Sequence, residues 1–266
     1  MANELTSKND NQNDQTDIAA QDADWARILV ACQVGRTGKS TVSDSVLANR
    51  LNGRIFSVES VNQDASQYGA KVRVYRANDM MRLRVDMATA EHPVIVDLGA
   101  SDFAVFLDKM DAANLFMDFS HCVIVADPTQ RGQEEAITTY DTLRRLGIDN
   151  SKFRFVLNKA HTGTKLPVQF DILFAHAQSN PDFPINQDCW LPENDLFRGL
   201  HQNGQGYREV LADKTDYKAL IRKALNDGDK ARATDYAMRQ TTQRMALGMQ
   251  EHFDRCFNAL GISATL

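Results

Sequence analysis

The chain has 266 residues, of which 43% are apolar and 24% charged, as in an ordinary globular protein with room for one α/β domain. No apolar run approaches the roughly 18–20 residues that cross a bilayer, and the N-terminus shows no apolar signal core, so we expect a cytoplasmic protein. The four cysteines form no C-x-x-C pair, which fits reduced thiols and argues against a disulfide or zinc framework. No histidine has metal-ligand spacing with another, and we expect His121, at the start of an apolar run, to be structural.

The formal net charge of −5 resides at the N-terminus. Residues 1–24 carry six acidic side chains against Lys8 alone, and the rest of the chain carries 29 basic and 29 acidic side chains. This segment has few apolar residues and is rich in Asn, Asp and Gln, so it cannot bury enough surface to offset its ordering entropy. We expect 1–24 to be a disordered acidic tail.

From Trp25 onward, short apolar runs alternate with stretches of helical length. The runs are RILVAC (27–32), RIFSVES (54–60), HPVIVDLGAS (92–101), HCVIVADP (121–128) and FRFVLNKA (153–160). The helical stretches between them include 40–53 and 132–148. Continuously apolar, β-branched strands that alternate with helices predict an α/β fold with a doubly wound, mostly parallel sheet, here over residues 25–212. Residues 213–266 predict a C-terminal helical extension packed on that domain, with a break at 226–229.

The segment QVGRTGKST (33–41) follows the first apolar run directly and precedes a helical stretch. In a phosphate-binding loop, backbone N–H groups and the helix N-terminus hold phosphate, a lysine reaches the β and γ oxygens, and the next hydroxyl binds Mg²⁺. Gly38, Lys39 and Ser40 supply this pattern, although its usual first glycine is Gln33. We therefore expect the segment to bind phosphate.

Two further apolar runs end in polar residues that suit a nucleotide. Asp97 lies at the carboxyl end of its strand, where parallel sheets bind ligands, and a carboxylate there suits the water shell of Mg²⁺. Asn158 ends another strand, and its amide offers both a donor and an acceptor to the edge of a purine. Farther on, CWLPENDLF passes through Pro192 into a helix.

In this order, the pieces from about Arg27 to Leu211 resemble the ParA/MinD superfamily of deviant Walker-type P-loop ATPases, which position plasmids, chromosomes, division machinery and other cargo. The motifs that carry the resemblance are the loop 33–41, VIVDLGAS, VLNKA and LPEND…GLHQNGQGY. The resemblance implies a mostly parallel, doubly wound sheet and an ATP-sandwich homodimer. Within the superfamily, the divergent loop favours the plasmid stability and conjugation accessory branch.

The resemblance also assigns ATP and Mg²⁺ as cofactors and gives individual residues a role. Ser40 and Asp97 would hold the metal, and Pro192 and Glu193 would lie near the base with Asn158 on the adenine. The nucleotide-binding set as a whole comprises Gly35, Arg36, Thr37, Gly38, Lys39, Ser40, Thr41, Asn158, Pro192 and Glu193.

Two departures from the family bear on catalysis. The family's signature lysine, which reaches the partner subunit's nucleotide, falls at Val34, and D-x-D-P-Q is replaced by ESVNQ. Glu59 therefore stands for the first aspartate, and Val61 for the one that orients the attacking water. Such a group is worth about 10²–10⁴ in rate, and a cation on the transferring phosphoryl group about 10³–10⁵. We expect the protein to bind ATP and to hydrolyse it slowly or not at all. Glu59 remains a weak catalytic candidate. Arg36 either replaces the missing cation in trans or contacts only solvent or phosphate in cis.

The function predicted is an ATP-binding dimerisation switch acting with an adaptor protein in plasmid partition or stability, conjugative DNA transfer or positioning of cellular cargo. Two alternatives stay open. One is a metabolic P-loop enzyme of the dethiobiotin-synthetase or cobyrinate-amidation type, for which no separate acid–base pocket is evident. The other is a nucleotide-free scaffold.

DNA and membranes are the other partners that the resemblance brings into question. ParA-like proteins often bind DNA without sequence preference through basic side chains. MinD-type relatives use a terminal amphipathic helix on membranes, but Glu251 and Asp254 interrupt the basic character that anionic lipids favour. We expect the apolar face Met245, Met249, Phe253, Cys256, Phe257 and Leu260 to pack on the domain or on a partner subunit. The candidate DNA-binding clusters are Lys71, Arg73, Arg76, Arg82 and Arg84; Arg144 and Arg145; and Lys218, Arg222, Lys223, Lys230 and Arg232.

Overall fold

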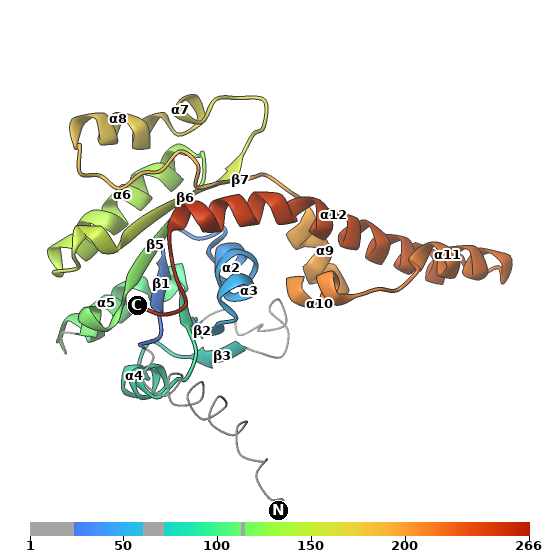
Figure 1. Ribbon diagram of the computed structural model, residues 1–266, viewed down its shortest axis with the longest axis horizontal. Coiled ribbons are helices and arrows are strands. Elements are labelled where there is room, and N and C mark those ends of the chain that lie inside the picture. The colour runs from blue at the N-terminus through green and yellow to red at the C-terminus, as the bar shows by residue number, and fades with distance from the viewer. Residues whose placement is uncertain (1–23, 61–71, 113–114) are drawn as a thin grey trace, which may run out of the picture.

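A computed structural model describes residues 24–60, 72–112 and 115–266, and its centre is a seven-stranded sheet (Figure 1). The strand order is β3-β2-β4-β1-β5-β6-β7, and every neighbouring pair is parallel. The strands are β1 (Arg27–Ala31), β2 (Arg54–Val58), β3 (Val72–Tyr75), β4 (Val94–Leu98), β5 (His121–Ala126), β6 (Phe153–Ala160) and β7 (Trp190–Pro192). The predicted doubly wound sheet is confirmed, and in the described residues it is wholly rather than mostly parallel.

Alternation along the strands divides the core into two layers. In β1, Leu29 and Ala31 face one layer, whereas Ile28 and Val30 face the other, because successive side chains of a strand point to opposite faces. The first layer is covered by α4 (Met80–Ala88), α5 (Phe103–Ala112), α6 (Gln130–Arg145) and α8 (Asp171–Ser179). The second is covered by the helix after the phosphate-loop segment, α9 (Leu196–Asn203), α10 (Tyr207–Ala212) and α12 (Lys230–Leu260). Burial on both faces explains why the central strands are continuously apolar.

The helix after the phosphate-loop segment is not a uniform α-helix. It begins as α2 (Lys39–Thr41), widens into a π-helix over Val42–Ala48 and ends as α3 (Asn49–Leu51). Gly53 then starts the return to β2, where a Cβ would lie 2.5 Å from Ile95 Cδ1. π-Helical turns inside helices occur frequently at functional sites, and this one directly follows the phosphate-loop segment.

The C-terminal helices have a packed half and a projecting half. In α12, the second core layer buries Met249, Phe253, Cys256 and Leu260. The apolar face of this helix therefore packs on the sheet domain of the same chain. α11 (Tyr217–Asn226) and the first part of α12 project from the body as a two-helix arm (Figure 1). At the base of the arm, α12 contacts α9. Thr242 Oγ1 accepts a hydrogen bond from Asn203 Nδ2 at 3.1 Å, and it packs so closely on Gly199 that a Cβ added to this glycine would lie 2.5 Å away.

The remaining described elements are short. They are α7 (Leu166–Gln169) and 3₁₀ turns at Ala100–Asp102, Leu115–Asp118 and Asn150–Lys152. No helix in the described ranges has both the length and the apolar character needed to cross a membrane. Of the predicted acidic tail (1–24), residues 1–23 lie outside the part of the chain that the structure describes.

Candidate functional site

The phosphate-loop segment lies at the topological switch point of the sheet. β1 is hydrogen-bonded to β4 on one side and to β5 on the other, so the chain winds outward in both directions from this strand. In open α/β sheets, ligands bind outside the carboxyl ends of the strands at such a point. Residues 32–38 leave the carboxyl end of β1 and lead into α2 at this position.

The loop is folded around the Lys39 side chain. Lys39 is 8% exposed, and its Nζ donates to the carbonyl oxygens of Cys32 at 3.3 Å and Val34 at 3.1 Å. Left-handed conformations at Arg36 (φ 67°) and Gly38 (φ 95°) allow the chain to curl in this way. The ammonium group is thus nearly buried with carbonyl partners, an arrangement that an anionic phosphate would stabilise further.

The end of β6 holds the loop from the other side. Asn158 is 5% exposed, and its Nδ2 donates to Thr37 O at 2.7 Å, while Lys159 (φ 57°) donates to Arg36 O. A Cβ on Gly38 would lie 2.0 Å from Asn158 Nδ2, so only glycine fits here. At least one N–H group of Asn158 therefore supports the loop backbone, and its contact with adenine stays a prediction.

Ser40, the residue after Lys39, is hydrogen-bonded to Asp97 of β4. Ser40 Oγ donates to Asp97 Oδ2 at 2.9 Å, and the Asp97 carboxylate is 5% exposed. Mg²⁺ takes oxygen ligands and usually keeps several waters, with one or two protein groups and substrate phosphates completing its shell. A hydroxyl and a carboxylate fit that ion. In the part of the chain that is described, no three His, Cys, Asp or Glu side chains gather as a metal cluster, so a zinc-type centre has no donor set there.

Glu59 lies at the same edge of the sheet. It follows β2, the neighbour of β4, and its Oε1 accepts a hydrogen bond from Ser101 Oγ at 3.0 Å. A Cβ on Gly99 would lie 2.5 Å from Glu59 Oε2, which shows how closely the carboxylate packs on the turn after β4. Val61 lies outside the described residues, so the structure places Glu59 and Ser60 of the altered D-x-D motif but not its third residue.

The other predicted residues differ in their exposure. Gly35 and Arg36 are exposed, Thr41 is half-buried, and Thr37 is buried with no partner for its Oγ1. Glu193 donates its N–H to Ala160 O at 3.0 Å, and its carboxylate lies 3.4 Å from His161 Nδ1. Pro192 and Glu193 are therefore adjacent to the end of β6, which carries Asn158.

Sequence reasoning missed three supporting residues. Lys159, next to the predicted Asn158, lies 4.0 Å from Asp127, which caps its own turn by accepting from the Thr129 N–H at 3.1 Å. Thr139 Oγ1 accepts the Gln33 N–H at 3.1 Å. A usable signal existed for Asp127, because it ends a buried strand just as Asp97 does.

Asp44 lies in the π-helical turn behind the loop. Burial raises the pKa of its carboxyl group to about 6, against a smaller opposing effect of the Arg208 charge. Burial likewise lowers the pKa of the Arg208 guanidinium. The two side chains form no ion pair in the described residues and affect each other only through their charges.

Comparisons with known proteins place the fold. No protein-family model matches the chain, and no curated protein matches it in sequence. Among solved structures, the MinC:MinD cell division protein complex of Aquifex aeolicus is 11% identical, with a TM-score of 0.50 over 84% of this chain and 96% of that chain. A plasmid partition protein of Borrelia burgdorferi bound to AMPPNP is 11% identical, with a TM-score of 0.49 over 82% and 97% of the two chains. McdA of Cyanothece in complex with ATP is 12% identical, with a TM-score of 0.48 over 85% and 97%. The first of these structures, with a TM-score of 0.50, confirms the resemblance to ParA/MinD ATPases at the level of the fold.

Proposed function

We propose that this protein is a nucleotide-dependent switch of the ParA/MinD kind, which binds ATP with Mg²⁺, dimerises in that state and hydrolyses ATP slowly or not at all. The observation that carries the proposal is the convergence of Lys39, Ser40 and Asp97 around a curled loop at the switch point of the sheet. A fold that had lost its ligand would have no need for a nearly buried lysine ammonium, because its two carbonyl partners bring no opposite charge and burying a charge without one is costly.

The residues that would bind phosphate are positioned independently of those that would cleave it. Lys39 and Gly38 depend on the loop and on Asn158, whereas Glu59 depends on the turn after β4. Val34 offers no charge in trans, and its carbonyl oxygen is already bonded to Lys39. Binding without efficient turnover is the behaviour that this separation supports.

Arg36 is the residue best placed to contact a second subunit. Its side chain is exposed at the tip of the loop, while Lys159 holds its carbonyl oxygen and so fixes the backbone. A fixed backbone with an outward-pointing guanidinium suits a contact in trans. If Arg36→Ala leaves both ATP-dependent dimerisation and turnover unchanged, this role is wrong.

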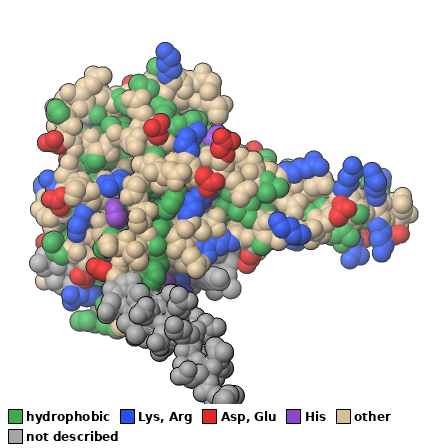
Figure 2. All heavy atoms as spheres, viewed as in Figure 1, with side chains coloured by type: hydrophobic (Ala, Val, Ile, Leu, Met, Phe, Trp, Pro, Cys, Tyr) green, Lys and Arg blue, Asp and Glu red, His purple; other side chains and the backbone are tan. Residues whose placement is uncertain are grey.

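DNA binding, as part of this proposal, belongs to the arm rather than to the basic cluster on β3 and α4. Arg73 is paired with Asp86 at 3.0 Å and Arg84 with Asp118 at 3.1 Å, and Lys71 lies outside the described residues. The arm segment 213–245 carries eight basic and five acidic side chains, and Figure 2 shows Lys and Arg gathered over it. Lys218, Arg222, Lys223 and Lys230 are exposed there. The double change Arg222→Glu with Lys223→Glu should weaken binding and flatten its salt dependence, because phosphate contacts release counterions; retention in high salt would contradict it.

The test of the switch is titration calorimetry with ATP and ADP in the presence of Mg²⁺, with light scattering on the same samples. We expect ATP to bind and the mass to double. Lys39→Ala should abolish binding, and Asp97→Asn should weaken its Mg²⁺ dependence. Lys109→Ala, which changes an exposed lysine of α5, is the matched control and should bind as the unchanged protein does.

Other outcomes identify the alternatives. Absence of ATP binding would contradict the proposal and leave a nucleotide-free scaffold. Phosphate release that depends on a small-molecule substrate would indicate a metabolic P-loop enzyme. The cellular context, which we propose to be plasmid partition or stability, conjugative DNA transfer or positioning of cargo, is tested by co-purifying an adaptor with and without ATP.

A further inference from the structure

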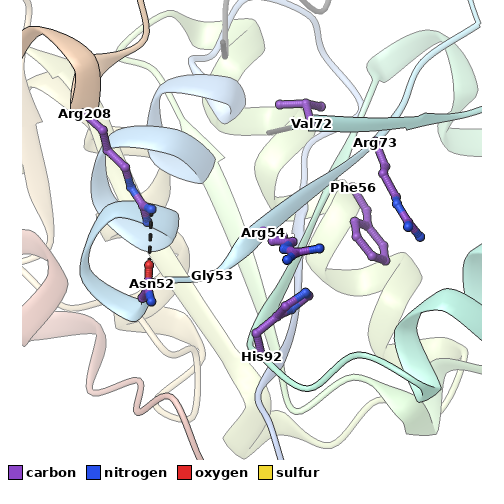
Figure 3. Close-up of a pocket in the computed structure, with 8 residues that line it drawn as sticks. All are labelled: Asn52, Gly53, Arg54, Phe56, Val72, Arg73, His92 and Arg208. Atoms are coloured by element: carbon purple, nitrogen blue, oxygen red, sulfur yellow. Dashed lines mark hydrogen bonds between the residues drawn. The ribbon is translucent and has the colours of Figure 1, made fainter. Parts of the chain in front are cut away.

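A cavity of about 470 Å³ opens at the amino ends of β2 and β3, at the opposite edge of the sheet from the phosphate-binding loop (Figure 3). Arg54 is the first residue of β2, Val72 the first of β3, and His92 precedes β4 by two residues. Since all strands are parallel, these positions lie at the edge away from residues 32–38. The lining residues are Asn52, Gly53, Arg54, Phe56, Val72, Arg73, His92 and Arg208.

The lining is strongly basic. Three of its eight residues are arginines and one is a histidine, and no carboxylate is among them. Arg73 forms an ion pair with Asp86, and the negative charge of Asp44 acts on Arg208. Arg54 forms no ion pair with any of the described residues. An adjoining cavity of about 300 Å³ shares Arg54, Phe56, Arg73 and His92 with the first and is lined in addition by Asp86 and Glu91. Arg208, by contrast, lines only the larger of these two cavities, where no carboxylate accompanies it.

Two lining residues have buried polar atoms without a hydrogen-bond partner. They are His92 Nδ1 and Arg208 Nη2, two of the five such side-chain atoms in the described part of the chain. A second guanidinium nitrogen of Arg208, Nη1, donates a long hydrogen bond of 3.5 Å to Asn52 Oδ1, which Figure 3 shows as a dashed line. An unpaired buried polar group costs about 1–3 kcal/mol, so native proteins seldom leave one without a reason.

We propose that this cavity is a second ligand site, which binds a small molecule carrying a phosphate group through Arg54, Arg208 and His92. Guanidinium groups match phosphate oxygens with paired N–H donors, and a histidine adds a further donor. The volume lies in the range of small-molecule sites and exceeds what a lone phosphate needs. Phe56 and Val72 provide apolar wall for the organic part of the ligand.

The test uses the full-length Lys39→Ala variant, so that the phosphate-binding loop does not contribute. Calorimetry with inorganic phosphate, mononucleotides and sugar phosphates, alongside their unphosphorylated counterparts, measures the site. We expect saturable binding of at least one phosphorylated compound and none of its unphosphorylated form. Arg54→Gln and Arg208→Gln should each weaken that binding about tenfold or more, as expected for charge-assisted hydrogen bonds.

Two controls keep the result interpretable. Arg244→Gln removes an exposed arginine of α12 that does not line the cavity, and it should leave the affinity unchanged. Arg54 is exposed, so Arg54→Gln should fold even if the change at Arg208 does not. The result is independent of the proposed switch, because the loop lysine is absent throughout.

Three outcomes would overturn the proposal. The first is no binding by any phosphorylated compound. The second is binding that Arg54→Gln and Arg244→Gln weaken equally, which would indicate diffuse attraction to a basic surface. The third is binding of a single-stranded oligonucleotide that Arg54→Gln abolishes while no mononucleotide or sugar phosphate binds, which would make the cavity part of a nucleic-acid surface.

Discussion

The change Gly38→Ala tests whether the loop geometry described above is what binds nucleotide. The new Cβ would lie 2.0 Å from Asn158 Nδ2 and 3.3 Å from Asn158 Cγ, at a residue with φ of 95°. The left-handed conformation costs an alanine about 1–2 kcal/mol. Displacing Asn158 also breaks its bond to Thr37 O and leaves buried polar groups unpaired, at about 1–3 kcal/mol. The sum predicts a loss of about 2–5 kcal/mol in the free energy of unfolding, together with loss of ATP binding.

Two other glycines of the chain separate these contributions. Gly35 lies in the same loop with no atom within 4 Å of a Cβ and no positive φ, so Gly35→Ala should change stability by less than about 0.5 kcal/mol and retain ATP binding. Gly147 has φ of 90° but also no atom within 4 Å, so Gly147→Ala should show the conformational cost alone. Urea denaturation and calorimetry with ATP on the three variants measure the difference. If Gly38→Ala is no less stable than Gly147→Ala and still binds ATP, the close packing of Asn158 on the loop does not matter and the reasoning is refuted.

The remaining predictions concern titratable groups. The pKa of Asp44 is raised to about 6 in the folded protein, so its contribution to stability is full below about pH 4 and is lost as the pH rises through 6. Asp44→Asn should therefore be more stable than the unchanged protein at pH 7–8, by at most about 3 kcal/mol in the free energy of unfolding, and equally stable near pH 4. Urea titrations at both pH values measure this difference. Burial lowers the pKa of His121 to about 4, so the protein should lose stability as the pH falls from 6.5 to 4. His121→Asn should reduce this dependence of the free energy of unfolding on pH in the same titrations. An unaltered dependence would show that His121 does not titrate as described. The thiols of Cys189 and Cys256 lie 3.6 Å apart, and all four cysteines are buried, so a thiol reagent should react only as fast as the protein unfolds; rapid labelling of native protein would contradict this burial.

The features that sequence reasoning predicted are those set by local pattern. β1, β2, β4, β5 and β6 are buried along most of their length, so their β-branched runs indicated strands directly. β3 and β7 were missed as strands. β3 is an edge strand whose side chains are half-exposed, with Arg73 between two valines, and β7 has only three residues. Neither offers an apolar run long enough to stand out.

Within the site, sequence identified residue types but not their contacts. The amide of Asn158 was predicted to contact the edge of the adenine base. In the structure it donates to the carbonyl oxygen of Thr37, a contact between segments that lie over a hundred residues apart in the chain. The π-helical turn cannot be recognised from periodicity, because it covers only seven residues. The contact of Cys189 with Cys256 joins the residue before β7 to α12 and has no local signal at all.

The close approach of α9 and α12 has a mechanical consequence. Thr242 lies against Gly199, and the twelve residues of α12 that precede Thr242 span about 18 Å at 1.5 Å per residue. If α12 bends by about 10° at this contact, its first residue moves through about 3 Å, whereas the buried half of the helix stays in place. α9 begins at Leu196, only three residues after Glu193, which we propose to lie near the bound base. Through α9, a displacement of that segment would therefore reach the arm.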